Sequence, residues 1–224
     1  MNIDSSWTRP GWRLLGAEKQ MNSVVRDCES LTEPDIAFLE RLEGHLGILA
    51  DLSRADVLLY CPLSEHRAAV VAQASPHSIL PIYSESLVDR EVTFREEPAV
   101  LRALVEGKRG LIEVHRSKNA PRPPAKGSPV FQETFPVRGL DGQVIAAVCI
   151  ETNLIEHVRH RRRSRVFQRA IKQLKESVLT GHLVGAAELT PFADHDGVLV
   201  VDNEYRIQYI SGVATNLYRK LGYT

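Results

Sequence analysis

The strongest constraint on the fold is a pair of apolar, β-branched segments joined by a glycine-containing turn. Residues 130–137 and 143–150 are rich in Val, Ile and Phe, and the turn at 139–142 reads Gly-Leu-Asp-Gly. Two such segments around a short loop of this composition predict a β-hairpin. The chain is therefore expected to contain an antiparallel sheet.

The segments before this hairpin predict two helices and further strands. Thr32 is a helix N-cap, and Pro34 and two acidic residues follow in the first turn. Apolar residues then recur at three- and four-residue steps to about residue 52, as in an amphipathic helix. The other predicted elements are strands at 55–61, 67–74 and 111–115, a short edge segment within 81–88, and a helix from 97 to 107. This order predicts an α+β domain, in which one antiparallel sheet has helices on one face.

The segment after the hairpin predicts one long helix, from about residue 153 to 180, ended by Gly181. Its second half carries a narrow apolar seam, as expected for a helix that packs along a partner helix. We expect this seam to form a parallel homodimer and to act as the signalling helix. The seam residues are Phe167, Ile171, Leu174 and Val178.

Composition excludes several classes of protein. The chain has 28 basic and 28 acidic residues, so no global charge attracts it to nucleic acid or to a membrane. No apolar run approaches the roughly 20 residues of a membrane span, and the N-terminus has no signal-peptide core. Its three cysteines are odd in number and widely spaced, which suits a reducing compartment. We expect a cytoplasmic protein.

The last stretch of the chain predicts a second unit. Residues 198–201 and 206–210 are strand-like around an Asp-Asn-Glu turn, and an amphipathic helix follows. This pattern resembles the opening of a PAS sensor domain, of which most is missing, so we expect a longer parent protein. The predicted organisation is an N-terminal arm at 1–32, a sensor domain at 33–152, a linker or signalling helix at 153–183, and an incomplete PAS domain at 190–224.

The sensor domain resembles a GAF domain, and the whole arrangement is similar to the N-terminal region of soluble GAF-PAS histidine kinases. Several short motifs carry this resemblance together, at 49–53, 55–60, 136–138, 142–146, 151–153 and 161–164. The resemblance implies a GAF-like antiparallel sheet with helices, a homodimer, and a parent kinase that phosphorylates a response regulator, in some relatives one of the ANTAR type. The sequence departs from the pattern in a proline-rich insertion at 116–129 and contains no phosphoacceptor helix or ATP-binding motif.

A GAF domain usually holds its ligand between the sheet and the segments that cover one face, where polar side chains would orient it. Five polar residues in or beside the predicted strands are candidates for such a small-molecule site. The alternative is that they point outward or are satisfied by neighbouring backbone. The candidates are Tyr60, Gln73, Tyr83, His115 and Glu133.

Other reactive or charged residues have simpler interpretations. Cys61 and Cys149 could support redox chemistry, but no resolving cysteine lies near them in sequence, and buried thiols are common. The arginine-rich segment 159–165 could bind phosphate, a nucleotide or nucleic acid, although a solvated helix is favoured because no aromatic residues interleave with it. His157 and His160 could share a helix face as a metal pair, but without further ligands a surface pair is favoured.

These observations favour a sensory and dimerisation module of a cytosolic two-component kinase, which relays a ligand or partner signal through the long helix. The alternatives are a standalone small-molecule-binding GAF regulator and a cysteine-dependent enzyme. We predict no catalytic residues, no metal site and no cofactor in this chain; ATP and magnesium are implied only for the missing kinase part. Membrane binding and direct nucleic-acid binding are not expected.

Overall fold

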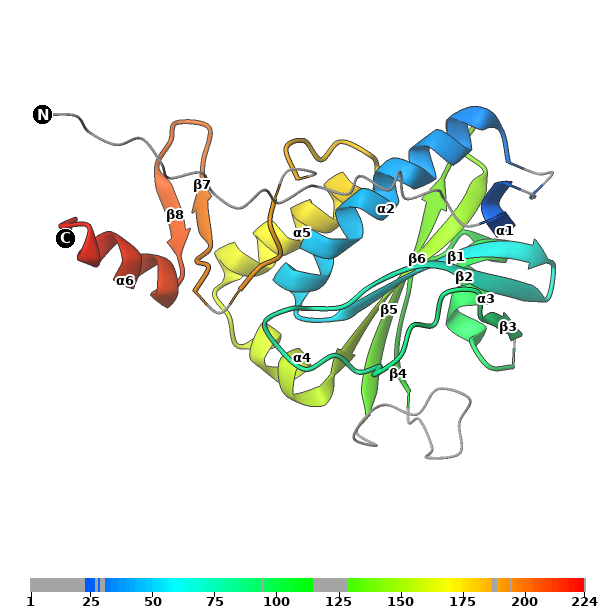
Figure 1. Cartoon of the computed structure of the whole chain (residues 1–224), viewed down its shortest axis with the longest axis horizontal. Helices are drawn as coiled ribbons and strands as arrows, with labels where there is room; N and C mark the ends of the chain where they lie inside the picture. Colours follow the sequence, from blue (N-terminus) through cyan, green and yellow to red (C-terminus); the bar gives the residue numbers. More distant parts are fainter. Residues whose placement is uncertain are drawn as a thin grey trace, which may run out of the picture.

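A six-stranded antiparallel sheet lies at the centre of the computed structural model, in the order β3-β2-β1-β6-β5-β4 (Figure 1). The structure describes residues 23–26, 28, 31–93, 95–114, 129–186, 189–193 and 195–223. The strands of this sheet are β1 (Asp56–Ser64), β2 (Arg67–Ala74), β3 (Glu91–Thr93), β4 (Gly110–Val114), β5 (Val130–Arg138) and β6 (Val144–Asn153). The helices around it are α1 (Ser23–Arg26), α2 (Glu33–Ser53), α3 (Pro98–Glu106), α4 (Leu154–Arg161) and α5 (Arg165–Leu179).

Helix α2 begins as its sequence predicts. The Thr32 hydroxyl accepts the backbone N–H of Asp35, and the Asp35 carboxylate accepts the N–H of Thr32 at 3.1 Å, which completes a capping box. The predicted apolar stripe is buried, since Leu39, Leu42, Leu46 and Leu49 are at most 1% exposed. This helix is therefore fixed onto the sheet along its whole length.

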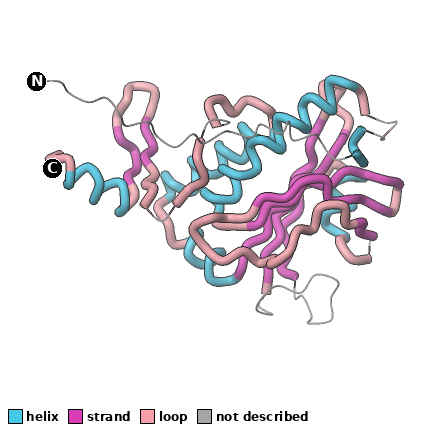
Figure 2. The backbone as a smooth tube through the Cα atoms, viewed as in Figure 1, coloured by secondary structure: helices cyan, strands magenta, loops and turns pink. Residues whose placement is uncertain are grey.

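Helices cover both faces of the sheet, and the prediction that they cover one face is wrong. Helices α2 and α5 pack together over one face, whereas α3 packs on the other (Figures 1 and 2). Val57 and Leu59 of β1 contribute to the α2-side core, and the alternate residues Leu58 and Tyr60 contribute to the α3-side core. Because both faces are buried, β1 reads as an unbroken apolar run with no polar alternation to mark a solvent face.

The central hairpin is confirmed. Strands β5 and β6 pair in register, and the turn is closed by the Gly139 N–H donating to the Gln143 carbonyl at 2.9 Å. Gly142 adopts a φ of +83°, which side chains disfavour. A Cβ at Gly139 would lie 2.3 Å from Asp35, so this turn also packs closely against the start of α2.

The predicted edge segment is displaced along the chain. The edge strand is β3 at Glu91–Thr93, which pairs with the start of β2, and residues 81–88 form a non-regular segment. Most of the predicted N-terminal arm and the proline-rich insertion at 116–129 lie outside the described residues, apart from α1, Cys28, Leu31, Thr32 and Pro129.

The single long helix predicted at 153–180 is wrong, because the chain forms two helices, α4 and α5, with a break between them. Ser164 is the N-cap of α5, and its hydroxyl accepts the Phe167 N–H at 3.2 Å. The Gln168 side-chain amide donates to the carbonyls of Arg161 at 3.1 Å and Arg163 at 2.9 Å, around the C-terminus of α4. A serine N-cap competes with helix continuation, so Ser164 was the overlooked signal. Gly181 follows α5 with a φ of +70°, as predicted.

The predicted seam of α5 faces the same chain instead of a partner helix. Phe167 and Val178 are at most 1% exposed and Ile171 is 7% exposed. Val178 belongs to the α2-side core, and Leu174 packs against it. Three of the four predicted seam residues are thus buried within the single chain, and Leu174 is partly buried. The homodimer through these side chains stays a prediction.

A smaller unit follows α5 and consists of β7 (Leu199–Val201), β8 (Ile207–Ile210) and α6 (Gly212–Lys220). Its two strands pair antiparallel, as the sequence predicts. The Tyr209 and Phe167 rings meet at 5.2 Å and connect β8 with α5. Several of its apolar residues are exposed, including Ile207 at 55% and Leu217 at 43%.

Candidate functional site

Two carboxylates anchor the segment that connects β2 with β3. Asp56, at the start of β1, accepts the Ser75 hydroxyl and the Ile82 backbone N–H, both at 2.6 Å. Asp56 is 1% exposed. Burial raises the pKa of Asp56 to about 6, against the opposing hydrogen bonds from Ser75 and Ile82, and the nearby charge of Glu151 adds to the increase.

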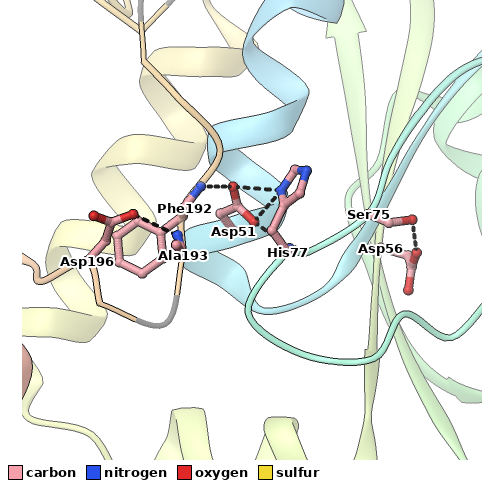
Figure 3. Close-up of polar contacts among 7 residues, drawn as sticks. All are labelled: Asp51, Asp56, Ser75, His77, Phe192, Ala193 and Asp196. Atoms are coloured by element: carbon pink, nitrogen blue, oxygen red, sulfur yellow. Dashed lines mark hydrogen bonds and ion pairs between the residues drawn. The ribbon is translucent and has the colours of Figure 1, made fainter.

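Asp51, in the last turn of α2, joins this connecting segment to the C-terminal part of the chain (Figure 3). Its Oδ1 accepts the backbone N–H of His77 at 2.7 Å and lies 3.0 Å from the His77 ring Nδ1. Its Oδ2 accepts the backbone N–H of Phe192 at 3.0 Å. Asp51 is 4% exposed, so its oxygens depend on these protein donors. One carboxylate thus holds two segments that are more than a hundred residues apart in sequence.

The sequence contains a signal for this role of Asp51. A negative charge in the last turn of a helix is disfavoured by the helix dipole. Asp51 occupies that position in α2, where no basic residue compensates in the same turn. Such a residue suggests tertiary donors, and here His77 and Phe192 provide them.

A buried polar cluster lies on the α3 side of the sheet. The Gln132 side-chain amide donates to Glu97 at 2.7 Å and to Glu151 at 3.1 Å. The Tyr83 hydroxyl donates to the other Glu151 oxygen. Gln132, Glu97 and Glu151 are at most 2% exposed. These bonds tie strands β5 and β6 to the start of α3 and to the segment anchored by Asp56.

The structure brings together only some of the predicted ligand-binding residues. Tyr60 and Tyr83 both lie in the α3-side core, where they are 0% and 5% exposed. The Gln73 side chain accepts the Leu87 N–H at 2.6 Å and so positions the connecting segment. His115 lies outside the described residues.

Glu133 is separated from the other candidates because it points to the opposite face of the sheet. It pairs with Lys175 of α5 at 2.5 Å and with Arg109 at 2.6 Å. Burial opposes its ionisation, but the charge of Lys175 and the hydrogen bonds from Lys175 and Arg109 outweigh this effect and lower the pKa of Glu133. Glu133 therefore belongs to a second polar region, beneath α4 and α5.

The arginine-rich segment is divided between the two helices and the break. Arg159 pairs with the buried Glu156 at 2.5 Å, and Arg54 binds the same carboxylate at 2.7 Å. The Arg163 guanidinium lies 4.6 Å from the centre of the Phe167 ring. The segment is therefore partly a set of structural contacts, in contrast to the fully solvated helix that we favoured.

The two histidines of α4 do not behave as the surface pair that we favoured. The His157 ring stacks on Phe131 with centroids 3.8 Å apart. Burial, together with the charge of Arg163, lowers the pKa of His160 to about 4. Within the described ranges, no group of three or more His, Cys, Asp or Glu residues is placed to hold a metal ion.

The cysteines occupy unreactive positions. Cys61 and Cys149 are both 0% exposed, and neither forms a disulfide within the described residues. Burial raises the pKa of the Cys61 thiol, and the neighbouring Cys28 adds to this increase. A buried thiol with a raised pKa is a poor nucleophile, so the interpretation of Cys61 as a buried apolar side chain is favoured by its surroundings.

The sheet order, the helical layer of α2 and α5, and the covered α3 side define an α+β fold of the GAF type. The family model described as "Histidine kinase PdtaS, GAF domain" matches residues 21–170. This chain belongs to that family of histidine kinase GAF domains. A search of curated proteins finds no match.

One solved structure supports the same fold. A structure described as the sensor region of a sensor histidine kinase has a TM-score of 0.61 and 23% identity, and the match covers 86% of this chain. The chain spans 64% of the length of that structure. A putative IclR transcriptional regulator from Silicibacter sp. gives a TM-score of 0.43 at 14% identity, over 66% of this chain and 67% of the other. Within the described ranges, no helix is both long and apolar enough to cross a membrane.

Proposed function

We propose that this chain is the sensory input region of a cytoplasmic two-component histidine kinase, and that Asp51 carries the signal from the sensor domain toward the C-terminal unit. The observation that carries this proposal is the double hydrogen bonding of Asp51, to His77 and to Phe192. Membership in a histidine kinase GAF family supplies the signalling context.

The proposed relay begins in the segment between β2 and β3, which covers one end of the α3-side core. A small molecule or partner that displaces this segment moves His77 away from Asp51. The buried Asp51 carboxylate then loses donors, which destabilises its contact with Phe192, because an unsatisfied buried charge is costly. If the signal binds one of two conformations of the sensor domain about 1.4 kcal/mol more tightly than the other, the ratio of their populations changes tenfold.

The downstream part of the proposal is a PAS domain that begins with β7, β8 and α6, followed by dimerisation and ATPase domains. Support comes from the exposed apolar residues of this unit, since a two-stranded sheet is marginal alone and needs further packing. In the parent, ATP and magnesium would serve the kinase domain, and a response regulator would accept the phosphoryl group.

The proposed parent is a homodimer, with a contact surface that differs from the predicted seam. Helix α4 exposes three apolar side chains, Leu154 at 41%, Ile155 at 65% and Val158 at 37%. Replacing Ile155 and Val158 by glutamate is expected to weaken self-association in light scattering of the full kinase. An unchanged dimer mass would exclude this face as the contact.

The relay is tested in the full-length kinase by measuring autophosphorylation with labelled ATP. Asp51→Ala removes the contacts to both His77 and Phe192, whereas His77→Ala removes the ring contact and keeps the backbone N–H. Both variants are expected to change basal activity in the same direction, and Asp51→Ala is expected to have the larger effect. His66→Ala is the matched control, since His66 is an exposed histidine in the turn between β1 and β2. Hydrogen exchange at the Phe192 amide shows whether its bond to position 51 is lost in each variant. If this amide exchanges faster and autophosphorylation is unchanged in both variants, the relay is refuted.

A further inference from the structure

A cavity lies on the opposite face of the sheet from the predicted ligand site. It has a volume of about 340 Å³, and its lining includes residues of β4, β5 and β6 on one side and of α4 and α5 on the other. Sites for small molecules commonly have volumes of about 300–1,000 Å³. The cavity is therefore large enough for a compact ligand.

The walls of this cavity carry an excess of positive charge. Among the described residues, four cationic side chains and one carboxylate, Glu133, line it, and Glu133 is bound to two of these cations. The cations are Arg109, Arg161, Lys172 and Lys175. The excess is three positive charges, because four cations face one anion. Guanidinium and ammonium groups gathered in one concave site favour multiply charged anions.

Uncharged polar groups in the lining also lack protein partners. Ser53 is 4% exposed, and within the described residues neither its hydroxyl nor the His160 Nε2 has a hydrogen-bond partner. His160 is neutral at pH 7, because burial and Arg163 lower its pKa to about 4. Buried polar atoms are almost always paired in native proteins. A ligand with hydroxyl or carboxylate oxygens would supply these missing partners.

The lining also includes apolar side chains and the polar residues Thr152 and Gln168. Leu111, Ile150 and Ile171 contribute apolar surface, beside the stacked rings of Phe131 and His157. Helix α4 is fixed in place by the buried Glu156. This surface suits the carbon skeleton of an organic molecule, and the fixed helix keeps the cavity open before a ligand arrives.

We propose that this cavity binds a compact organic polyanion, either a phosphate ester or a molecule with several carboxylates. The cations would hold its charged groups, the Ser53 hydroxyl would bond one of its oxygens, and the apolar wall would contact its skeleton. The proposal does not depend on the Asp51 relay, since Asp51 and its donors lie outside this lining.

The test is isothermal titration calorimetry of the chain at low ionic strength, with citrate and inorganic pyrophosphate as the two probes. Saturable one-site binding of either probe supports the proposal and identifies the class, carboxylate or phosphate. Acetate, a monoanion, is expected to bind at least tenfold more weakly. Failure of both polyanions to saturate, or equal binding of acetate, would overturn the proposal.

Matched variants distinguish this cavity from general attraction to a basic surface. Arg161→Gln with Lys172→Gln is expected to weaken binding about tenfold, because two charge-assisted contacts are lost. Arg165→Gln with Arg169→Gln removes the same charge from exposed positions of α5 outside the lining, and is expected to stay within about twofold. Equal weakening by the two pairs would overturn the proposal.

Ser53→Ala provides a test that does not alter charge. A structural role for the hydroxyl predicts lower stability of the free protein and unchanged affinity. The proposed role predicts unchanged or higher stability of the free protein, since an unpaired buried hydroxyl is removed, together with about fivefold weaker binding. Unchanged affinity in this variant would remove Ser53 from the site and contradict the proposal as stated.

Discussion

The two faces of the central sheet differ in the charge that they bury, although they share the same strands. On the α3 side, Asp56, Glu97 and Glu151 are at most 2% exposed, and Gln132 bridges two of them. On the α5 side, cationic groups surround Glu133. Gln132 and Glu133 are consecutive residues of β5.

This contrast follows from the geometry of a β-strand, in which successive side chains point to opposite faces. One strand can therefore supply a polar group to an acidic layer and the next residue to a basic one. Opposite electrostatic environments therefore become possible within one small domain.

The largest effect is expected from placing a charge in the core of the α5 side. Val178→Asp should destabilise the protein by about 4 kcal/mol or more, because Val178 is fully buried and the new carboxylate has no partner. Urea denaturation measures this loss. Gln173→Asp, at an exposed position of the same helix, is the control and should change stability by less than about 0.5 kcal/mol. If Val178→Asp instead dissociated a folded dimer, the intramolecular packing of α5 would be wrong.

The next effect concerns Asp56 and the acidic α3 side. Its pKa is about 6 in the folded protein and lower when unfolded, so the folded state holds more protons between about pH 4 and pH 6. Stability should fall as the pH rises through this window, by up to about 3 kcal/mol, and remain lower above it.

Asp56→Asn tests this assignment, since the amide oxygen can still accept the Ile82 N–H and the amide nitrogen can donate to the Ser75 hydroxyl. Urea midpoints between pH 4 and pH 7 should decline less steeply in this variant than in the wild type. Asp141→Asn, in the exposed hairpin turn, should retain the wild-type decline. Identical pH profiles for Asp56→Asn and the wild type would rule out Asp56 as the source.

A moderate effect on stability is expected when one cationic side chain is removed from the α5 side of the sheet. Lys175→Met should destabilise the protein by about 1–3 kcal/mol, because Glu133 loses its closest partner. The pKa of Glu133 should rise, because burial raises it and only Arg109 would remain to lower it. Carbon-detected NMR titration of the Glu133 carboxyl measures the shift. Lys172→Met is the control, because Lys172 pairs with the exposed Glu176 at 3.8 Å and should leave the Glu133 titration in place.

The smallest effect concerns the break between α4 and α5. Ser164→Ala should destabilise the protein by about 1 kcal/mol, the usual result of losing an N-cap. Thermal unfolding followed by circular dichroism detects this change. Ser64→Ala, at the exposed end of β1, is a control for the loss of a serine hydroxyl. A gain in helix content with higher stability would mean that the sequence prefers the continuous helix.

The elements with strong local signals could be predicted from the sequence. The capping box at Thr32, the hairpin of β5 and β6, and the glycine stop at Gly181 depend on nearby residues, and each is present. The break at Ser164 was missed because the apolar spacing of α5 continued to look helical across it. Apolar periodicity indicates which face of a helix is buried, but it does not show where the helix begins. A single side-chain hydroxyl at the N-cap can determine that position.

The candidate site was less predictable, because its contacts join residues far apart in sequence. The predicted residues Tyr60 and Tyr83 lie in one core, but the choice of face for Glu133 depends on strand register. The role of Asp51 depends on donors from His77 and Phe192, which no local pattern connects to α2. Tertiary hydrogen bonds of this kind follow from the assembled fold.

The corner between α4 and α5 has a mechanical consequence. A continuous helix moves along its axis as one body. Two helices that meet at an angle can instead convert a movement of the first helix into a rotation of the second. Here α4 is fixed to the domain through Glu156, and α5 ends where the chain turns toward the C-terminal unit. Because Val178 near the end of α5 is fully buried in the α2-side core, a tilt near Ser164 would have to move α5 and α2 together.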